Sequence, residues 1–162
     1  MKRFTHGLVL FAGLLAVPSS KDSDMAFAEM LHYEADPRLE AIRAFFAYND
    51  SPAAKLASDF VAAADNYGLD WRLLPSIAFV ESGGGKECVN NNILGWANGR
   101  RAFHSLSAGI HYVGYQLMNS PLYRGKDTSG ILRTYNPRPE YARLVKSVMA
   151  TLGPDAFSEA RQ

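Results

Sequence analysis

The sequence predicts a compact all-α or mainly α domain, and three observations support that class. Apolar side chains recur every three or four residues in successive segments, which is the period of a helix buried on one face. Start and stop signals such as Asp-Pro, Ser-Pro and Gly-Pro separate these segments. No run of strand length alternates apolar with polar residues. The 162 residues, 48% of them apolar, suffice for one domain with a buried core.

Two helices are predicted before residue 69. The first begins at Asp36-Pro37, because an acid suits the capping position and proline suits the first helical position, and it ends at Asn49-Asp50. The same start signal recurs at Ser51-Pro52 for the second helix, which Gly68 ends. The predicted buried faces consist of Leu39, Ile42, Phe45 and Phe46 in the first helix and of Leu56, Phe60, Ala64 and Tyr67 in the second.

The third predicted helix leads into a segment without helical period. Asp70 is expected to cap this helix, and the run from Leu73 to Val80 is almost wholly apolar. After Glu81-Ser82 come three glycines, and residues 83–104 are rich in Gly and Asn. They are predicted to form a long loop, with a small β-hairpin at Asn98-Gly99 as an option. A loop of about twenty residues is uncommon in a small domain and is often functional.

Three more helices are predicted after this loop. Ser105 caps the fourth, which ends at Ser120-Pro121, and a short helix follows over residues 128–134. The proline-rich break at 136–139 separates it from the last helix, which ends at Gly153-Pro154. The expected apolar positions are Leu106, Ile110, Val113 and Leu117 in the fourth helix and Tyr141, Leu144, Val145, Val148 and Leu152 in the last.

The first residues have the features of an export signal. Lys2 and Arg3 precede an apolar run from Gly7 to Val17, which at about 11 residues is too short to span a bilayer. We expect a signal peptide over residues 1–28, cleaved between 19 and 28, with a buried N-terminal helix as the alternative. The protein would then be secreted, periplasmic or in the cell wall. The remaining chain divides into an N-terminal helical segment at 29–50, the main helical domain at 51–153 and a polar tail at 154–162.

Charge and cysteine content exclude several functional classes. With 17 basic and 16 acidic residues, the chain has a net charge of only +1, which gives no reason to expect nucleic acid or an anionic membrane as a partner. Cys88 is the only cysteine, so an intramolecular disulfide and a cysteine zinc cluster are both impossible. His32, His104 and His111 lack metal-ligand spacing. We therefore expect no metal, no cofactor and no stable membrane anchor after signal cleavage, and a monomer.

Glu81 is the residue most suggestive of chemistry. It ends an apolar helix, and its neighbours at i−4 and i−3 are Ile77 and Ala78, which places its carboxyl on or beside the buried face. Apolar surroundings raise the pKa of a carboxyl, and a carboxyl that stays protonated can act as a general acid. The alternative is a surface glutamate at a fraying helix end, where it would oppose the helix dipole.

Two further segments carry groups suited to binding a sugar. The loop holds three successive asparagines at 90–92, which offer amide donors and acceptors, and Trp96, whose flat ring fits a sugar face. Tyr135 stands before the break at Asn136-Pro137, so its phenol could be held toward a cleft. Each has a structural alternative, since asparagine favours turns and single aromatic residues usually belong to a core.

Other catalytic arrangements are poorly supported. Ser82 with His104 or His111 would suggest a hydrolase triad, but the glycine that a nucleophile elbow requires two residues before the serine is missing. Cys88 beside Lys86 and Glu87 would suggest a reactive thiol, but no catalytic histidine accompanies it in the sequence.

Taken together, these segments resemble a family. The stretch LDWRLLPSIAFVESGGGK at 69–86 resembles the catalytic helix of bacterial lysozyme-superfamily cell-wall enzymes, namely glucosaminidase-domain autolysins and lytic transglycosylases. NNILGW at 91–96 resembles the NN-x-FG segment of glucosaminidases, with Leu94 in place of phenylalanine. Phe103-His104-Ser105 with Ile110 resembles the segment that follows it, and Tyr135-Asn136-Pro137 resembles the tyrosine motif of lytic transglycosylases. The transglycosylase GLMQ segment is absent, which favours the glucosaminidase branch.

The resemblance implies a lysozyme-like fold and a glucosaminidase catalytic domain over 51–153. It implies an endo-β-N-acetylglucosaminidase that cleaves a β-1,4 bond of peptidoglycan glycan strands. Glu81 would be the general acid, with Tyr135 near the reaction centre. The residues expected to bind substrate are Ser82, Asn91, Asn92, Gly95, Trp96 and Asn136. The alternatives are a lytic transglycosylase that gives an anhydro-sugar product and a non-catalytic glycan-binding protein of the same fold.

The second catalytic group is left open by the sequence. Glycosidases normally use two carboxylates, and the sequence offers Glu87 in the loop and Asp127 and Glu140 beside the tyrosine segment. The simplest expectation is a substrate-assisted route, in which Glu81 is the acid and base and the acetamido group or a hydroxyl of the sugar attacks.

Overall fold

The computed structural model describes residue 25 and residues 36–154. The chain separates into two units, Met1–His32 and Tyr33–Gln162, and of the first unit only Met25, a helical and exposed residue, is described. The predicted signal peptide, apart from Met25, lies outside the described residues, as do residues 29–35 and the tail beyond Pro154. The hydrophobic core described by the structure belongs to the second unit.

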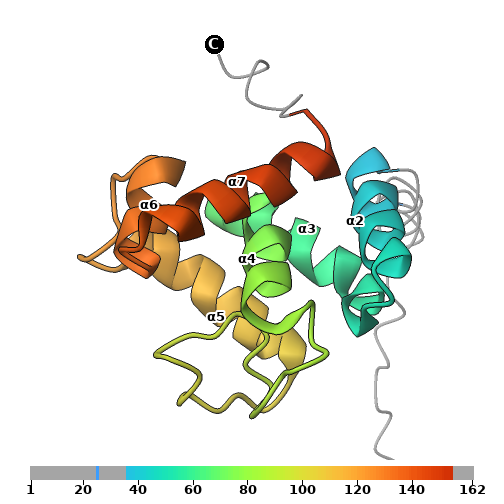
Figure 1. Ribbon diagram of the computed structural model, residues 1–162, viewed down its shortest axis with the longest axis horizontal. Coiled ribbons are helices and arrows are strands. Elements are labelled where there is room, and N and C mark those ends of the chain that lie inside the picture. Colours follow the sequence, from blue (N-terminus) through green and yellow to red (C-terminus); the bar gives the residue numbers. More distant parts are fainter. Residues whose placement is uncertain (1–24, 26–35, 155–162) are drawn as a thin grey trace, which may run out of the picture. The chain divides into compact units, whose positions relative to one another are not determined.

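Residues 36–154 form α-helices and one 3₁₀ helix, and no β-strand occurs among them, so the all-α prediction is confirmed (Figure 1). In chain order the elements are α2 (Pro37–Tyr48), η1 (Pro52–Leu56), α3 (Ala57–Tyr67), α4 (Leu73–Ser82), α5 (Leu106–Asn119), α6 (Thr128–Tyr135) and α7 (Pro139–Leu152).

Several predicted helix boundaries are confirmed by their caps. The Asp36 carboxylate accepts a hydrogen bond from the Arg38 backbone N–H at 2.9 Å, and the Ser105 hydroxyl accepts one from the Ala108 N–H at 3.1 Å. Gly68 ends α3 with φ of 64°, a left-handed conformation that favours glycine. These short-range contacts depend on neighbouring residues alone, which is why the sequence predicts them.

Three details differ from the prediction. The second helix begins as a 3₁₀ turn, η1, before α3 starts at Ala57. α4 starts at Leu73, because the Asp70 carboxylate accepts the N–H of Arg72 and so caps a turn that precedes the helix. Leu144, expected on the buried face of α7, is 54% exposed.

The optional β-hairpin is also absent. Residues 83–104 form consecutive turns, and Asn90, Asn91, Ala97 and Asn98 all have positive φ between 54° and 57°. Positive φ suits the two residues of a hairpin turn at Asn98-Gly99, but the flanking residues must be extended. Ala97, which directly precedes this turn, is left-handed, and no residue of 83–104 is in a strand, so the hairpin does not form. The prediction of a long loop is confirmed.

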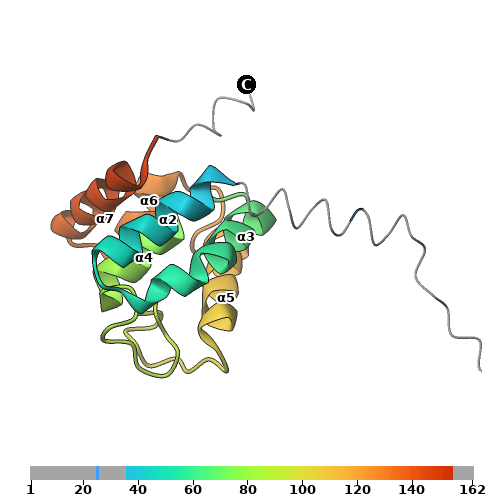
Figure 2. The same cartoon turned by 90° about the vertical axis from the view of Figure 1, so that its right-hand side faces the viewer.

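α4 is the central helix of this unit. It packs against α7 and α3, while α3 packs along α5. Figure 1 shows α4 in the middle of the group of helices, and Figure 2 shows it beneath α2. Its first six residues are all buried. α2, which the sequence analysis set apart in the segment 29–50, belongs to the same core through Leu39, Ile42 and Phe46.

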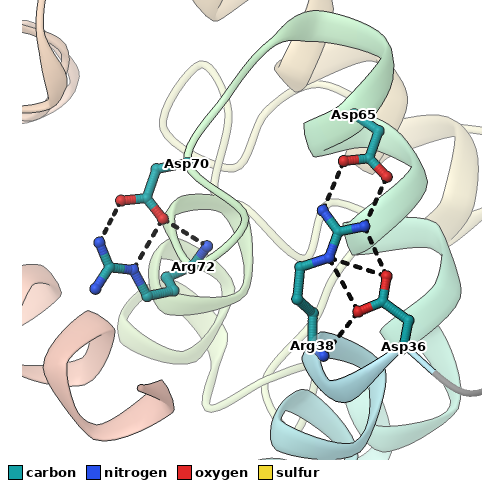
Figure 3. Close-up of polar contacts among 5 residues, drawn as sticks. All are labelled: Asp36, Arg38, Asp65, Asp70 and Arg72. Atoms are coloured by element: carbon teal, nitrogen blue, oxygen red, sulfur yellow. Dashed lines mark hydrogen bonds and ion pairs between the residues drawn. The ribbon is translucent and has the colours of Figure 1, made fainter. Parts of the chain in front are cut away.

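Two arginines fasten the helices to one another (Figure 3). The Arg38 guanidinium bridges Asp36 at the start of α2 and Asp65 in α3. The Arg72 guanidinium binds Asp70 and also donates to the backbone oxygen of Gly153 at 2.8 Å. Hydrogen bonds to charged groups contribute roughly 1.5 to 3 kcal/mol each when partly buried. The start of α4 is thereby fixed to the end of α7.

Candidate active site

A cleft of about 580 Å³ lies beside the C-terminal end of α4, a volume within the range of small-molecule sites. Its walls come from the end of α4, the loop 83–104, the residues after α5 and the end of α6. The lining residues are Glu81, Ser82, Glu87, Val89, Asn92, Gly95, Trp96, Ala97, Asn98, Gly99, Leu122, Tyr123, Tyr135 and Asn136. The structure therefore brings together most of the predicted site residues, although they are up to 55 positions apart in sequence.

The Glu81 carboxyl is half-buried in the wall of this cleft. It projects from the last turn of α4, where Gly83 ends the helix in a left-handed conformation with φ of 60°. Burial raises the pKa of Glu81, because loss of water disfavours the charged form. The protonated form of this side chain therefore persists to higher pH than in a freely hydrated glutamate.

Gly95 covers the Glu81 carboxyl from the loop side. Its φ is 67°, and a Cβ added there would lie 2.4 Å from a carboxyl oxygen of Glu81. Only glycine permits the loop backbone to approach this closely. Gly95 was predicted to bind substrate, and the structure shows that it also restricts where the acid can point.

Tyr141 also lies beside the acid. The residue is 7% exposed on α7, and its buried hydroxyl forms no hydrogen bond of normal geometry with the protein. The hydroxyl nevertheless lies near enough to Glu81 to offset part of the rise in the pKa of the carboxyl. Burial, followed by the charge of Glu81, raises the pKa of Tyr141, so the phenol stays protonated.

From the sequence, Tyr141 is expected only as a core residue of the last helix, and its position beside the acid is not predicted. The available signal was a tyrosine on an otherwise aliphatic face, since a buried hydroxyl needs a polar partner.

Tyr135 lines the same cleft as Glu81, as predicted. Its hydroxyl, however, donates a short hydrogen bond to the backbone oxygen of Leu94. Burial, and then the charge of Glu81, raises the pKa of Tyr135 well above its usual value. The Tyr135 phenol therefore ties the end of α6 to the loop, and its proton is directed at Leu94 rather than at the acid.

Ser82 and Asn92 are both buried, and their side chains bind backbone groups. The Ser82 hydroxyl donates to the oxygen of Ile93 at 2.8 Å and accepts the N–H of Gly85 at 3.0 Å. The Asn92 amide donates to the oxygens of Trp96 and Arg101 and accepts the Trp96 N–H. These contacts hold the loop against α4. For Asn92 this agrees with the structural alternative, since asparagine favours turns, whereas no structural role was predicted for Ser82. Substrate contact by either side chain remains a prediction.

Asn91 and Asn136 differ in position. Asn91 is exposed, does not line the cleft and donates to the oxygen of Phe103 at 3.0 Å. Asn136 lines the cleft and accepts the Arg138 N–H at 3.1 Å, which leaves its amide nitrogen available to a ligand. The structure thus places Asn136 with the acid but not Asn91.

Trp96 is half-buried within a cluster of aromatic rings. Its ring centroid lies 5.7 Å from that of Tyr135, 5.9 Å from that of Tyr123 and 6.1 Å from that of Tyr112. The indole therefore packs on the core while one part of it faces the cleft. Both interpretations of Trp96 from the sequence, binding platform and core residue, apply in part.

The structure forms neither the serine–histidine triad nor the reactive thiol that the sequence poorly supported. The Ser82 hydroxyl contacts backbone groups rather than a histidine, and His111 packs edge-on against Tyr67. Burial raises the pKa of Cys88, which disfavours a reactive thiolate. Among the described residues, no group of three His, Cys, Asp or Glu side chains could hold a metal ion, and no helix has the length and apolarity to cross a membrane.

Comparisons of the chain with protein-family models, curated proteins and solved structures found no match.

Proposed function

We propose that this protein is a peptidoglycan glycosidase in which Glu81 is the general acid. The observation that carries the proposal is the Glu81 carboxyl itself, half-buried at the end of an apolar helix and facing a cleft, with a raised pKa. A glycosidic oxygen is a poor leaving group until it is protonated. A carboxylic acid whose pKa is raised by burial keeps its proton to higher pH and can supply this step.

The cleft lining supports a neutral glycan as the substrate. Its described residues include Trp96, two tyrosines and several amides, but no lysine, arginine or histidine. Aromatic rings contact the apolar faces of sugars, and amides bind hydroxyl and acetamido groups. A phosphate backbone would require positive charge, so nucleic acid is disfavoured.

The choice of bond rests on the resemblance in residues 69–86, 91–96 and 135–137. It favours an endo-β-N-acetylglucosaminidase that acts on the β-1,4 bonds of the glycan strand, as an exported monomer. A lytic transglycosylase would use the same acid but release an anhydro sugar. A non-catalytic glycan-binding protein would use the same cleft without cleavage.

The test is digestion of purified cell walls by the chain and by Glu81→Gln. The amide keeps the shape of the side chain but cannot donate a proton, so turnover should fall by roughly 10² to 10⁴-fold or more. Circular dichroism should be unchanged. Mass spectrometry of the released glycan identifies the bond and any anhydro product. Equal activity of the two proteins would refute the role of Glu81, and an inactive wild type that binds glycan would favour the non-catalytic alternative.

A further inference from the structure

The cleft contains a second carboxylate. Of the described residues that line it, only Glu81 and Glu87 carry acidic side chains. The other candidates lie elsewhere: Asp127 caps α6 by accepting the Gly130 N–H at 2.7 Å, and Glu140 is exposed beside Arg143. Neither lines the cleft. The three acids that the sequence left open are thus reduced to Glu87.

The backbone holds Glu87 close to the end of α4. Its N–H donates to the Ser82 oxygen at 3.1 Å, and the Gly85 N–H donates to the same oxygen at 3.1 Å and to the Ser82 hydroxyl at 3.0 Å. Gly85 has φ of 98°, which lets the chain turn back at once. Because of this turn, Glu87 borders the same cleft as Glu81, which precedes it by six positions.

The two carboxyl groups have different surroundings. Glu81 is half-buried beneath Gly95 and beside Tyr141, whereas Glu87 is exposed and forms no ion pair with the described residues. Two carboxyl groups in unlike environments are the usual basis for dividing acid and base roles. Water reaches the Glu87 side and is restricted on the Glu81 side.

We propose that Glu87 is the base that activates water for attack on the anomeric carbon, an inference that rests on the proposed glycosidase function. Glu81 donates its proton to the glycosidic oxygen as the C1–O bond breaks. A water oxygen bonds to C1 from the opposite face, and its proton passes to Glu87. Glu87 returns a proton to solvent and Glu81 regains one. The β-linked sugar is released with inverted α configuration, as in two-carboxylate inverting glycosidases.

The first experiment compares Glu87→Gln with the wild type on purified cell walls. Turnover should fall roughly 100-fold or more, with the same thermal unfolding, because the amide cannot accept the proton. Glu40→Gln is the matched control, since Glu40 is an exposed glutamate on α2 that does not line the cleft, and it should keep wild-type turnover.

The second experiment reads the stereochemistry of the product. Proton NMR during the first minutes of wild-type digestion should show the α anomer at the new reducing end. Glu87→Ala should recover turnover in sodium azide and release an α-glycosyl azide, because azide attacks without a base.

The proposal is overturned by turnover of Glu87→Gln within about threefold of wild type, by a β or anhydro product, or by an azide product of β configuration. Those results leave Glu81 as the acid and point to the substrate-assisted route. If the wild-type protein itself does not cleave cell walls, both the proposed glycosidase function and the role of Glu87 are refuted.

Discussion

The two walls of the cleft are built differently. The helical wall comes from the ends of α4 and α6 and holds the half-buried Glu81, with the buried Tyr141 of α7 beside the acid. The loop wall, residues 83–104, has no regular structure, and hydrogen bonds from Asn92 and Ser82 to backbone groups stabilise it. The helical wall controls the charge of the acid, and the loop wall controls its position and its access to water. A proton donor in this protein therefore depends on both walls.

The largest effect is expected at Gly95, where the loop wall contacts the Glu81 carboxyl of the helical wall. In Gly95→Ala, the new methyl group would meet the Glu81 carboxyl and strain a residue with positive φ. Displacement of a catalytic group by about 1 Å can cost 10²-fold, so we expect turnover on cell walls to fall about 100-fold. Gly99→Ala is the control, because a Cβ there meets no atom within 4 Å although its φ is also positive. Similar turnover in both variants would show that the Gly95 contact is unimportant.

The second prediction concerns Trp96, which belongs to the loop wall but packs like a core residue. The sequence alone predicts that Trp96→Ala weakens substrate binding with a modest effect on stability. The contacts of the indole with three tyrosine rings predict instead a loss of about 2 kcal/mol in the free energy of unfolding. This is less than the roughly 3 to 5 kcal/mol of a fully buried large ring, because Trp96 is only half-buried. Urea denaturation measures this loss. An unchanged midpoint would show that the ring contributes only to the cleft surface.

The third prediction concerns Tyr135, which joins the two walls. The sequence alone predicts that Tyr135→Phe leaves thermal stability nearly unchanged. Because the hydroxyl donates to the Leu94 oxygen, the variant should instead lose about 1 kcal/mol of unfolding free energy, the usual value for a lost hydrogen bond. Thermal unfolding followed by calorimetry checks this, and an unaltered melting temperature would contradict the tie between α6 and the loop.

The last and smallest effect is expected for Tyr141→Phe, which alters the helical wall alone. The hydroxyl has no hydrogen-bond partner of normal geometry, so its removal should change stability by less than about 1 kcal/mol. It lowers the pKa of Glu81, so its loss should raise that pKa further. An acid works while it is protonated, and the alkaline limb of the pH–activity profile should therefore move to higher pH. A shift to lower pH, or none, would contradict the contact.

Much of the fold could be predicted from the sequence because its signals are local. Caps such as Asp36 and Ser105, and the stop at Gly68, depend on residues a few positions apart. The loop could not be predicted in the same way. Its path depends on Asn92, whose amide binds backbone oxygens four and nine residues away, and such contacts leave no periodic pattern.

The candidate site could also be predicted only where its signals are local. Glu81 could be found because it ends an apolar helix, and a carboxyl in that position is expected to be partly buried, as the structure shows it to be. Tyr141 could not, because it lies 60 positions away and its helix reads as an ordinary core helix. Tyr135 was placed in the right cleft, but the partner of its hydroxyl depends on the three-dimensional path of the loop.

The bond between Arg72 and the Gly153 oxygen has a consequence for the order of folding. Its partners are 81 positions apart, so it forms only after α7 has left the ribosome. Tyr141 lies in that same last helix. A nascent chain that lacks α7 leaves one face of α4 uncovered and Glu81 without Tyr141 beside it. The packing of α4, whose last turn carries Glu81, is therefore completed only after the whole domain has been synthesised.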